Sequence, residues 1–202
     1  MSNKEWQKAS DALKQLVDVE PSRWEYFQNL GTARLNLGQY NDSIQTFDKS
    51  ISLAQDQLKP ANPGASETTK IKTALGQMFT NEGNAYLKLR NNEKAIAMYS
   101  RAAELDPNPA TAYFNLCAVQ YNMGNVDGAI AACTKTIAAD PNKADAYFIK
   151  ASAMYGNGTM DPKGKFIVPP GTVDALKKYL ALAPQGAHVA DVKAMLEALD
   201  IK

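Results

Sequence analysis

Apolar and polar residues alternate through the middle of the chain at the spacing of a helical hairpin. We expect one helix over Ala110–Asn122, a turn at Gly124, and a second helix over Val126–Ala139. Asp140 and Pro141 end this second helix, because proline donates no backbone hydrogen bond and disfavours helical geometry in the residue before it. The pattern predicts pairs of helices, each pair closed by a proline turn.

The same hairpin returns at a fixed period. Pro107 precedes Pro141 by 34 residues, and Tyr113 precedes Tyr147 by the same distance. A fixed period of this length predicts a stack of identical structural units rather than one irregular domain. Small residues fall where two helix backbones must approach closely, at Gly83 against Ala95 and at Cys117 against Ala129.

These features resemble the tetratricopeptide repeat (TPR) family, whose signature spaces an aromatic residue, a Leu-Gly pair, a small residue, a second aromatic residue and a proline along each unit. The first unit matches with Phe27, Leu30, Gly31, Tyr40, Ser43 and Phe47, the second with Phe79, Gly83, Tyr86, Ala95, Tyr99 and Pro107, and the third with Tyr113, Leu116, Gly124, Ala129 and Pro141. The resemblance implies an all-α fold, a right-handed superhelix (α-solenoid) of TPR helix-turn-helix units.

Two insertions interrupt the period. The spacing from Phe27 to Phe79 leaves 18 extra residues, and a stretch rich in glycine and proline with a β-prone centre at Phe166 interrupts the fourth unit. We therefore expect a single array with these boundaries: 1–21, a half unit containing only a second helix; 22–58, unit 1; 59–75, an insertion or helix extension; 76–109, unit 2; 110–143, unit 3; 144–183, unit 4 with an inserted loop at 156–171; and 184–202, a C-terminal capping helix.

The two ends of the chain suggest a larger context. Because residues 1–21 match only the second half of a unit, we expect the native protein to be longer and to begin mid-array. The closing helix is similar to that of bacterial TPR proteins, many of them associated with the cell envelope. The location is therefore undecided between the cytoplasm and, if a native precursor carries an upstream signal, the periplasm or envelope.

The resemblance also implies where a partner binds, because the first helix of each TPR unit lines the concave groove of the array. Helical spacing selects recurring asparagines and a stripe of aromatic residues on this face. Amides hold an extended peptide backbone, and aromatic side chains anchor it. The predicted partner-binding residues are Asn81, Asn84, Lys88, Phe114, Asn115, Tyr121, Asn122, Phe148 and Tyr155.

Two structural interpretations compete with ligand binding in this groove, and one binding mode of the family is excluded. Asparagines at these positions often fix turns or neighbouring helices instead of a ligand. The aromatic stripe could pack under the inserted loop, with Phe166 and Ile167 filling the groove. Some TPR domains grip a C-terminal carboxylate with lysines and an arginine, but Thr80, Asp145 and Ile149 occupy those places, so we exclude that mode here.

Composition narrows the classes of partner. With 22 Lys and Arg against 21 Asp and Glu, the net charge of +1 gives no overall attraction to nucleic acid. No apolar run is long enough for membrane insertion. A protein or peptide partner is thus expected, and a homo-oligomer is possible.

Chemistry-bearing residues are few. His188 is the single histidine, and phosphate-binding or nucleophile motifs are missing from the sequence, so we expect no enzyme activity, no cofactor and no metal site. Cys117 and Cys133 are interpreted as buried free thiols, with a disulfide as the alternative if their Cα atoms lie within about 7 Å.

Arg34 and Glu82 occupy places that are normally apolar, on neighbouring first helices, and are predicted to form a partly buried ion pair. The sequence as a whole predicts a non-catalytic adaptor or scaffold that binds a peptide or protein partner in its groove. The alternative is a structural subunit that acts through self-association or packing in a larger complex.

Overall fold

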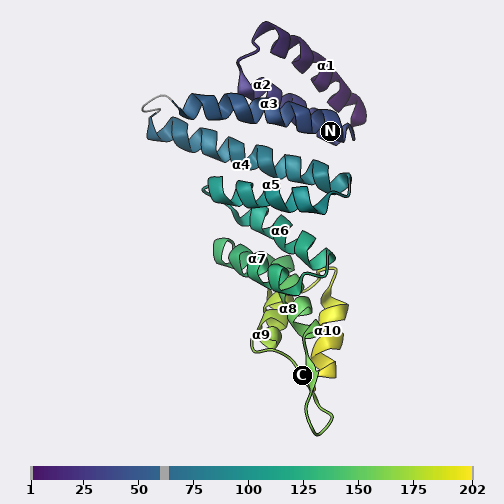
Figure 1. Ribbon diagram of the computed structural model, residues 1–202. Coiled ribbons are helices and arrows are strands. Elements are labelled where there is room, and N and C mark those ends of the chain that lie inside the picture. Colours follow the sequence, from purple (N-terminus) through teal and green to yellow (C-terminus); the bar gives the residue numbers. More distant parts are fainter. Residues whose placement is uncertain (1, 60–63, 202) are drawn as a thin grey trace. The chain divides into compact units, whose positions relative to one another are not determined.

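The computed structural model describes residues 2–59 and 64–201 and is almost entirely helical (Figure 1). The helices are α1 (Asn3–Val19), α2 (Trp24–Asn36), α3 (Tyr40–Leu58), α4 (Ala65–Lys88), α5 (Asn92–Leu105), α6 (Ala110–Asn122), α7 (Val126–Ala139), α8 (Ala144–Gly156), α9 (Thr172–Leu182) and α10 (Val189–Ala198). The chain divides into two compact parts, which we call the N-terminal part (to Ala112) and the C-terminal part (from Tyr113). The predicted all-α solenoid class is confirmed.

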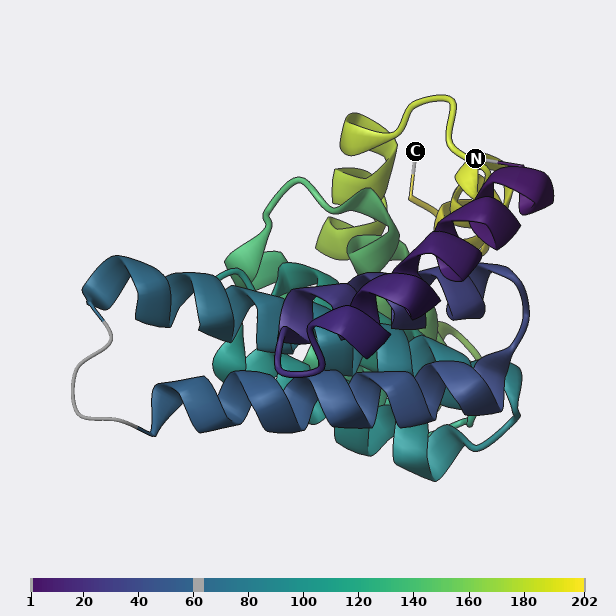
Figure 2. The same ribbon diagram turned by 90° about the horizontal axis from the view of Figure 1, so that it is seen from above.

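Helical hairpins build the N-terminal part. Helix α2 packs on α3, α4 packs on α5, and α3 packs against α4, so that the hairpins stack (Figures 1 and 2). Helix α1 packs on α2 and begins with a capping box, in which Ser2 and Glu5 each bond the other's backbone. The 18 extra residues mostly lengthen α3 to 19 residues and α4 to 24. Part of the predicted insertion, residues 60–63, lies outside the described residues.

Each N-terminal hairpin closes through a glycine set against an aromatic ring. A Cβ atom added at Gly31 would lie 2.7 Å from the ring of Phe47, and one added at Gly83 would lie 2.6 Å from the ring of Tyr99. Both rings are buried, so they cannot move aside into solvent. Glycine is required at these two positions because only the missing side chain lets the ring lie against the opposite backbone. The atoms nearest to the Cβ position of Gly83 belong to the Tyr99 ring, and the approach of Gly83 to Ala95 stays a prediction.

Two buried serines tie α3 to α2 in the first hairpin. The Ser43 hydroxyl donates to the carbonyl of Gly31 at 2.8 Å, and the Ser50 hydroxyl donates to the carbonyl of Trp24 at 2.7 Å. Both serines are fully buried, so these bonds satisfy polar groups that water cannot reach. They fix the register of α3 against α2 at two points along the crossing.

The third hairpin, α6 with α7, closes differently. Cys117 and Cys133 occupy the places held by Gly83 and Tyr99 one period earlier, and they form a disulfide with a Cα–Cα distance of 5.0 Å. Both cysteines are fully buried, as expected, but the interpretation as free thiols was wrong. The two small side chains leave a gap that is short enough for the sulfur atoms to bond across it.

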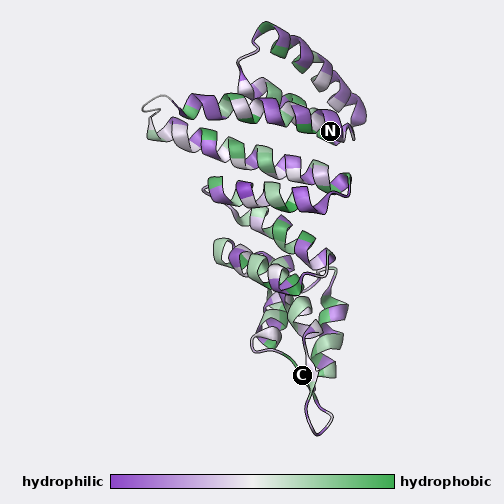
Figure 3. Ribbon diagram, in the orientation of Figure 1, coloured by the Kyte–Doolittle hydropathy of each residue, from purple (hydrophilic) through white to green (hydrophobic). Residues whose placement is uncertain are grey.

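The C-terminal part continues with α7 on α8, α8 on α9, and α9 on α10. Its core centres on Leu176, Tyr179 and Val192, with Tyr147 and Phe148 packed against it. In Figure 3 its helices are mostly pale green, whereas α1 is mostly purple. Among the described helices, none combines the length and apolar character needed to cross a bilayer.

The inserted loop of the C-terminal part forms a small antiparallel hairpin. Strand β1 (Thr159–Met160) pairs with β2 (Phe166–Ile167), with Met160 opposite Phe166. The Asp161 carboxylate accepts the backbone N–H groups of Lys163 and Lys165, each at 2.8 Å, and so holds the turn.

The predicted Arg34–Glu82 ion pair is wrong. Arg34 lies in the last turn of α2 and reaches within its own hairpin, donating to the Thr46 hydroxyl and the Asp42 carbonyl of α3. Glu82 lies on α4 and is only 3% exposed. Its carboxyl group interacts electrostatically with Lys94 and Arg101 of α5 instead. Each side chain has oppositely charged or hydrogen-bonding partners within its own hairpin.

Burial raises the pKa of Glu82 from 4.5 to about 7, with Asp48 adding repulsion, while Arg101, Lys94 and a hydrogen bond with Tyr86 act in the opposite direction. The buried carboxyl is therefore more easily kept protonated in the folded chain than in the unfolded chain.

Reduction of the disulfide should destabilise the C-terminal part. For a bridge with a sequence separation of 16 residues, we expect the loss of about 2–4 kcal/mol of unfolding free energy, measured by denaturant titration with and without a thiol reductant. The double variant Cys117→Ser/Cys133→Ser should behave like the reduced protein. The double variant Cys117→Gly/Cys133→Tyr, which copies Gly83 and Tyr99, should be stable and insensitive to reductant. Equal stability of the serine variant and the oxidised protein would contradict this account.

The stability of the N-terminal part should depend on the protonation of Glu82. Between pH 4.5 and about 7 the unfolded chain ionises Glu82 while the folded chain keeps the proton, so stability falls as pH rises through this window and stays lower above it. Glu82→Gln should remove this decline and raise stability near pH 8 by roughly 1–3 kcal/mol. Urea denaturation at several pH values tests this, with exposed Glu104→Gln as the control that should leave the decline in place.

Candidate functional site

Three of the predicted groove residues lie on α4 in the N-terminal part. Asn84 accepts a hydrogen bond of 2.7 Å from the hydroxyl of Tyr99. Its amide oxygen therefore helps to hold α5 against α4, which is the structural role left open for these asparagines. Asn81 is half-buried and Lys88 is exposed.

The other six predicted residues lie in the C-terminal part, on α6 and α8, and four of them line one pocket of about 310 Å³. This pocket, which we call the aromatic pocket, is lined by Phe114, Ala118, Tyr121, Asn122, Asp145, Phe148, Ile149 and His188. Its walls come from successive turns of α6 and α8, where residues three or four apart share a face. Asn115 and Tyr155 lie on the same helices but outside the pocket lining.

His188 completes the aromatic pocket, and sequence reasoning missed it. It stands immediately before α10, and its ring stacks on Phe148 with 3.8 Å between centroids and 4° between planes. Its backbone N–H donates to the Tyr179 hydroxyl at 2.9 Å, which fixes the approach to the last helix. The Asp191 carboxylate lies 3.5 Å from Nδ1 of His188. Nothing in the sequence pairs positions 148 and 188, because the inserted β-hairpin, α9 and the connecting turns separate them.

Two charged side chains stand near the aromatic pocket, and only one of them has a partner among the residues that the structure describes. The Lys143 ammonium lies 4.4 Å from the centroid of the Phe114 ring, so one face of that ring already carries a cation. Asp145 is exposed at the start of α8 and has no ion pair within residues 2–59 and 64–201. The pocket therefore offers an apolar interior and one available carboxylate at its edge.

The inserted hairpin does not fill the aromatic pocket. Phe166 packs edge-on against Tyr155, with 5.0 Å between ring centroids, and Ile167 remains 49% exposed. The alternative in which both side chains occupy the groove is therefore wrong. The hairpin covers Tyr155 at the end of α8 and leaves Tyr121 38% exposed.

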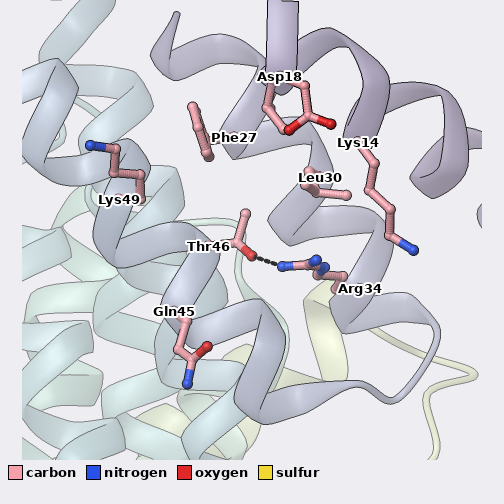
Figure 4. Close-up of a pocket in the computed structure, with 9 residues that line it drawn as sticks. Lys14, Asp18, Phe27, Leu30, Arg34, Gln45, Thr46 and Lys49 are labelled. Atoms are coloured by element: carbon pink, nitrogen blue, oxygen red, sulfur yellow. Dashed lines mark hydrogen bonds between the residues drawn. The ribbon is translucent and has the colours of Figure 1, made fainter. Parts of the chain in front are cut away.

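A second pocket, which we call the basic pocket, opens among α1, α2 and α3 in the N-terminal part and has a volume of about 380 Å³ (Figure 4). It is lined by Lys14, Val17, Asp18, Phe27, Leu30, Arg34, Gln45, Thr46 and Lys49. Figure 4 shows Arg34 directed at Thr46, Lys14 and Asp18 on the α1 side, and the Lys49 ammonium pointing away from Arg34. Sequence reasoning missed this pocket because it assigned Arg34 to Glu82.

Three repeat-family profiles match the chain. A profile described as TPR repeat matches residues 83–124, and two described as tetratricopeptide repeat match residues 25–57 and 119–161. No match is found among curated protein sequences.

Solved structures of TPR proteins are similar over most of the chain. A crystal structure of MamA is 25% identical, with a TM-score of 0.69 over 90% of this chain and 91% of MamA. A MamA fragment from Desulfovibrio magneticus RS-1 is 18% identical, with a TM-score of 0.64 over 90% of this chain and 88% of that one. YrrB, a TPR protein with an unusual peptide-binding site, is 18% identical, with a TM-score of 0.65 over 95% of this chain and 84% of YrrB.

The repeat profiles cover the hairpins whose crossing residues are described above, and the structural similarity extends through both parts of the chain. The chain belongs to the tetratricopeptide repeat family.

Proposed function

We propose that this chain is a non-catalytic protein-interaction module that binds a peptide or protein segment in the aromatic pocket. The observation that carries the proposal is the gathering of Phe114, Tyr121 and Phe148 around one cavity, closed on one side by His188. A concave site with aromatic anchors and few polar groups is typical of a binding site. YrrB has a peptide-binding site, but at 18% identity its likeness supports only the fold.

The pocket favours one anchoring side chain of the partner. Its interior is apolar through Ala118, Ile149 and the three rings, so an aliphatic or aromatic side chain fits there. Asn122 can hydrogen-bond the partner's backbone, and Asp145 can attract a neighbouring cation. A short segment that combines an apolar anchor with a basic residue suits this arrangement.

Tyr121→Ala should weaken such binding at least tenfold. The expected loss of about 1.4 kcal/mol or more follows from removing an aromatic anchor at the pocket wall. Peptides would be selected from a random display library on the unmodified protein, and their affinities for both forms measured by fluorescence anisotropy.

Met123→Ala provides the matched control, because Met123 is 46% exposed just beyond α6 and does not line the pocket. Its affinities should equal those of the unmodified protein. Selected peptides that bind Tyr121→Ala as tightly as the unmodified protein would refute the assignment of the site.

A second candidate is an assembly role through the last two helices. Leu180, Leu196 and Ile201 help to line an apolar pocket of about 550 Å³ on α9 and α10. Apolar surface of this kind favours packing against another protein chain.

Self-association through this surface should be concentration-dependent. Gel filtration with light scattering should show an oligomer that Leu180→Glu reduces to a monomer, whereas exposed Met160→Glu should have no effect. A monomer at every concentration tested would eliminate assembly of this chain with itself.

A further inference from the structure

We infer that the basic pocket is a second binding site, which takes a carboxylate carried next to an apolar side chain on a peptide. It is separate from the aromatic pocket, because all its lining residues belong to α1, α2 and α3 of the N-terminal part. The pocket combines three cationic side chains, one carboxylate and an apolar floor.

Arg34 is the centre of the site. Arg34 is half-buried, and one terminal nitrogen of its guanidinium donates to the Thr46 hydroxyl and the Asp42 carbonyl. Its Nε is buried without a hydrogen-bond partner, and no carboxylate pairs with Arg34 in the described part of the chain. A half-buried cation with unused donors and no counter-charge is costly, so an anion bound beside it gains more than at an exposed lysine.

The equivalent positions in the other hairpins lack this feature. Tyr86 occupies the place in the second hairpin, where it hydrogen-bonds Glu82. Gln120 occupies it in the third and accepts a hydrogen bond of 2.8 Å from the Asn125 amide. Both of these side chains are uncharged and make a hydrogen bond within the protein, whereas Arg34 is a cation with no paired carboxylate among the described residues. The charge at this position is therefore not needed to build a TPR hairpin.

The remaining walls select the ligand class. Val17, Phe27 and Leu30 supply an apolar floor, which a peptide side chain can cover but a bare phosphate or a nucleic-acid backbone cannot. Asp18 stands at the α1 side and repels ligands with several negative charges. The Lys14 ammonium lies 3.4 Å from the Asp11 carboxylate and the Lys49 ammonium points away from Arg34 (Figure 4), so these two lysines add positive charge at the rim and leave direct contact with the carboxylate to Arg34. A peptide segment with one acidic group beside a leucine or phenylalanine fits the pocket, because its single charge meets Arg34 and its apolar side chain covers the apolar floor.

The carboxylate can come from an acidic side chain or from a free C-terminus, and three probe peptides separate these sources. They are acetyl-Gly-Leu-Glu-Phe-Gly-amide, its glutamine counterpart, and the glutamine counterpart with a free C-terminal carboxylate. Binding to the full chain would be followed by NMR shifts of α1–α3 backbone amides and by calorimetry. We expect the glutamate peptide or the free-carboxylate peptide to bind at least tenfold more tightly than the uncharged one, with affinity falling as salt is added.

Arg34→Gln tests the centre of the site, because glutamine keeps a polar side chain with N–H donors but removes the charge. It should weaken the charged peptides about tenfold or more and leave the uncharged peptide unchanged. Lys4→Gln is the matched control, since Lys4 is exposed on α1 outside the pocket and carries the same charge change. If Arg34→Gln does not fold, judged by its circular dichroism, the exposed Lys49→Gln takes its place, with a smaller loss expected.

Several results would overturn the inference. Equal affinity for the charged and uncharged peptides would do so, as would charged peptides that bind Arg34→Gln undiminished. Tighter binding of inorganic phosphate or of a single-stranded oligonucleotide than of any peptide would assign the pocket to another class of ligand. Tyr121→Ala should leave this binding intact, so failure here is distinguishable from failure of the aromatic pocket.

Discussion

Two helices of one hairpin can pack closely only if one of them presents no bulky side chain at the crossing, because a single Cβ already fills the space that the opposite ring needs. Gly31 against Phe47 and Gly83 against Tyr99 meet this condition in the N-terminal part. The contact at the helix crossing fixes how the two helices of a hairpin are oriented, and that orientation determines which side chains line a pocket. Tyr99 shows the connection directly, because its ring lies on Gly83 while its hydroxyl holds Asn84.

The helices were predictable from the sequence because apolar spacing and proline turns are local signals that repeat. The aromatic pocket was partly predictable for the same reason, since Phe114, Tyr121 and Phe148 share helical faces. His188 was not, because its contact with Phe148 depends on the path of the chain after α9. The disulfide was not predictable, because the spacing of Cys117 and Cys133 places both in the core but does not tell whether their sulfur atoms come close enough to bond.

The wrong pairing of Arg34 with Glu82 has a general cause. Opposite charges at neighbouring positions of a stack suggest an ion pair, but each helix also has a partner within its own hairpin, at shorter range. Arg34 donates hydrogen bonds to a carbonyl and a hydroxyl oxygen of α3, and Glu82 interacts electrostatically with Lys94 and Arg101 of α5. The two pockets inferred for this chain therefore differ in origin, since one follows from residues that repeat and the other from a residue that breaks the repeat.

The disulfide gives the third hairpin a property that the glycine–aromatic hairpins do not have. Those hairpins close by the fit of a glycine against an aromatic ring, which does not depend on the redox conditions around the protein. The closure between Cys117 and Cys133 is completed only where two thiols can pass their electrons to an external disulfide, and it is undone where the surrounding thiol pool returns them. The final architecture of α6 and α7 is thus fixed after synthesis by the chemistry of the compartment and not by the gene alone.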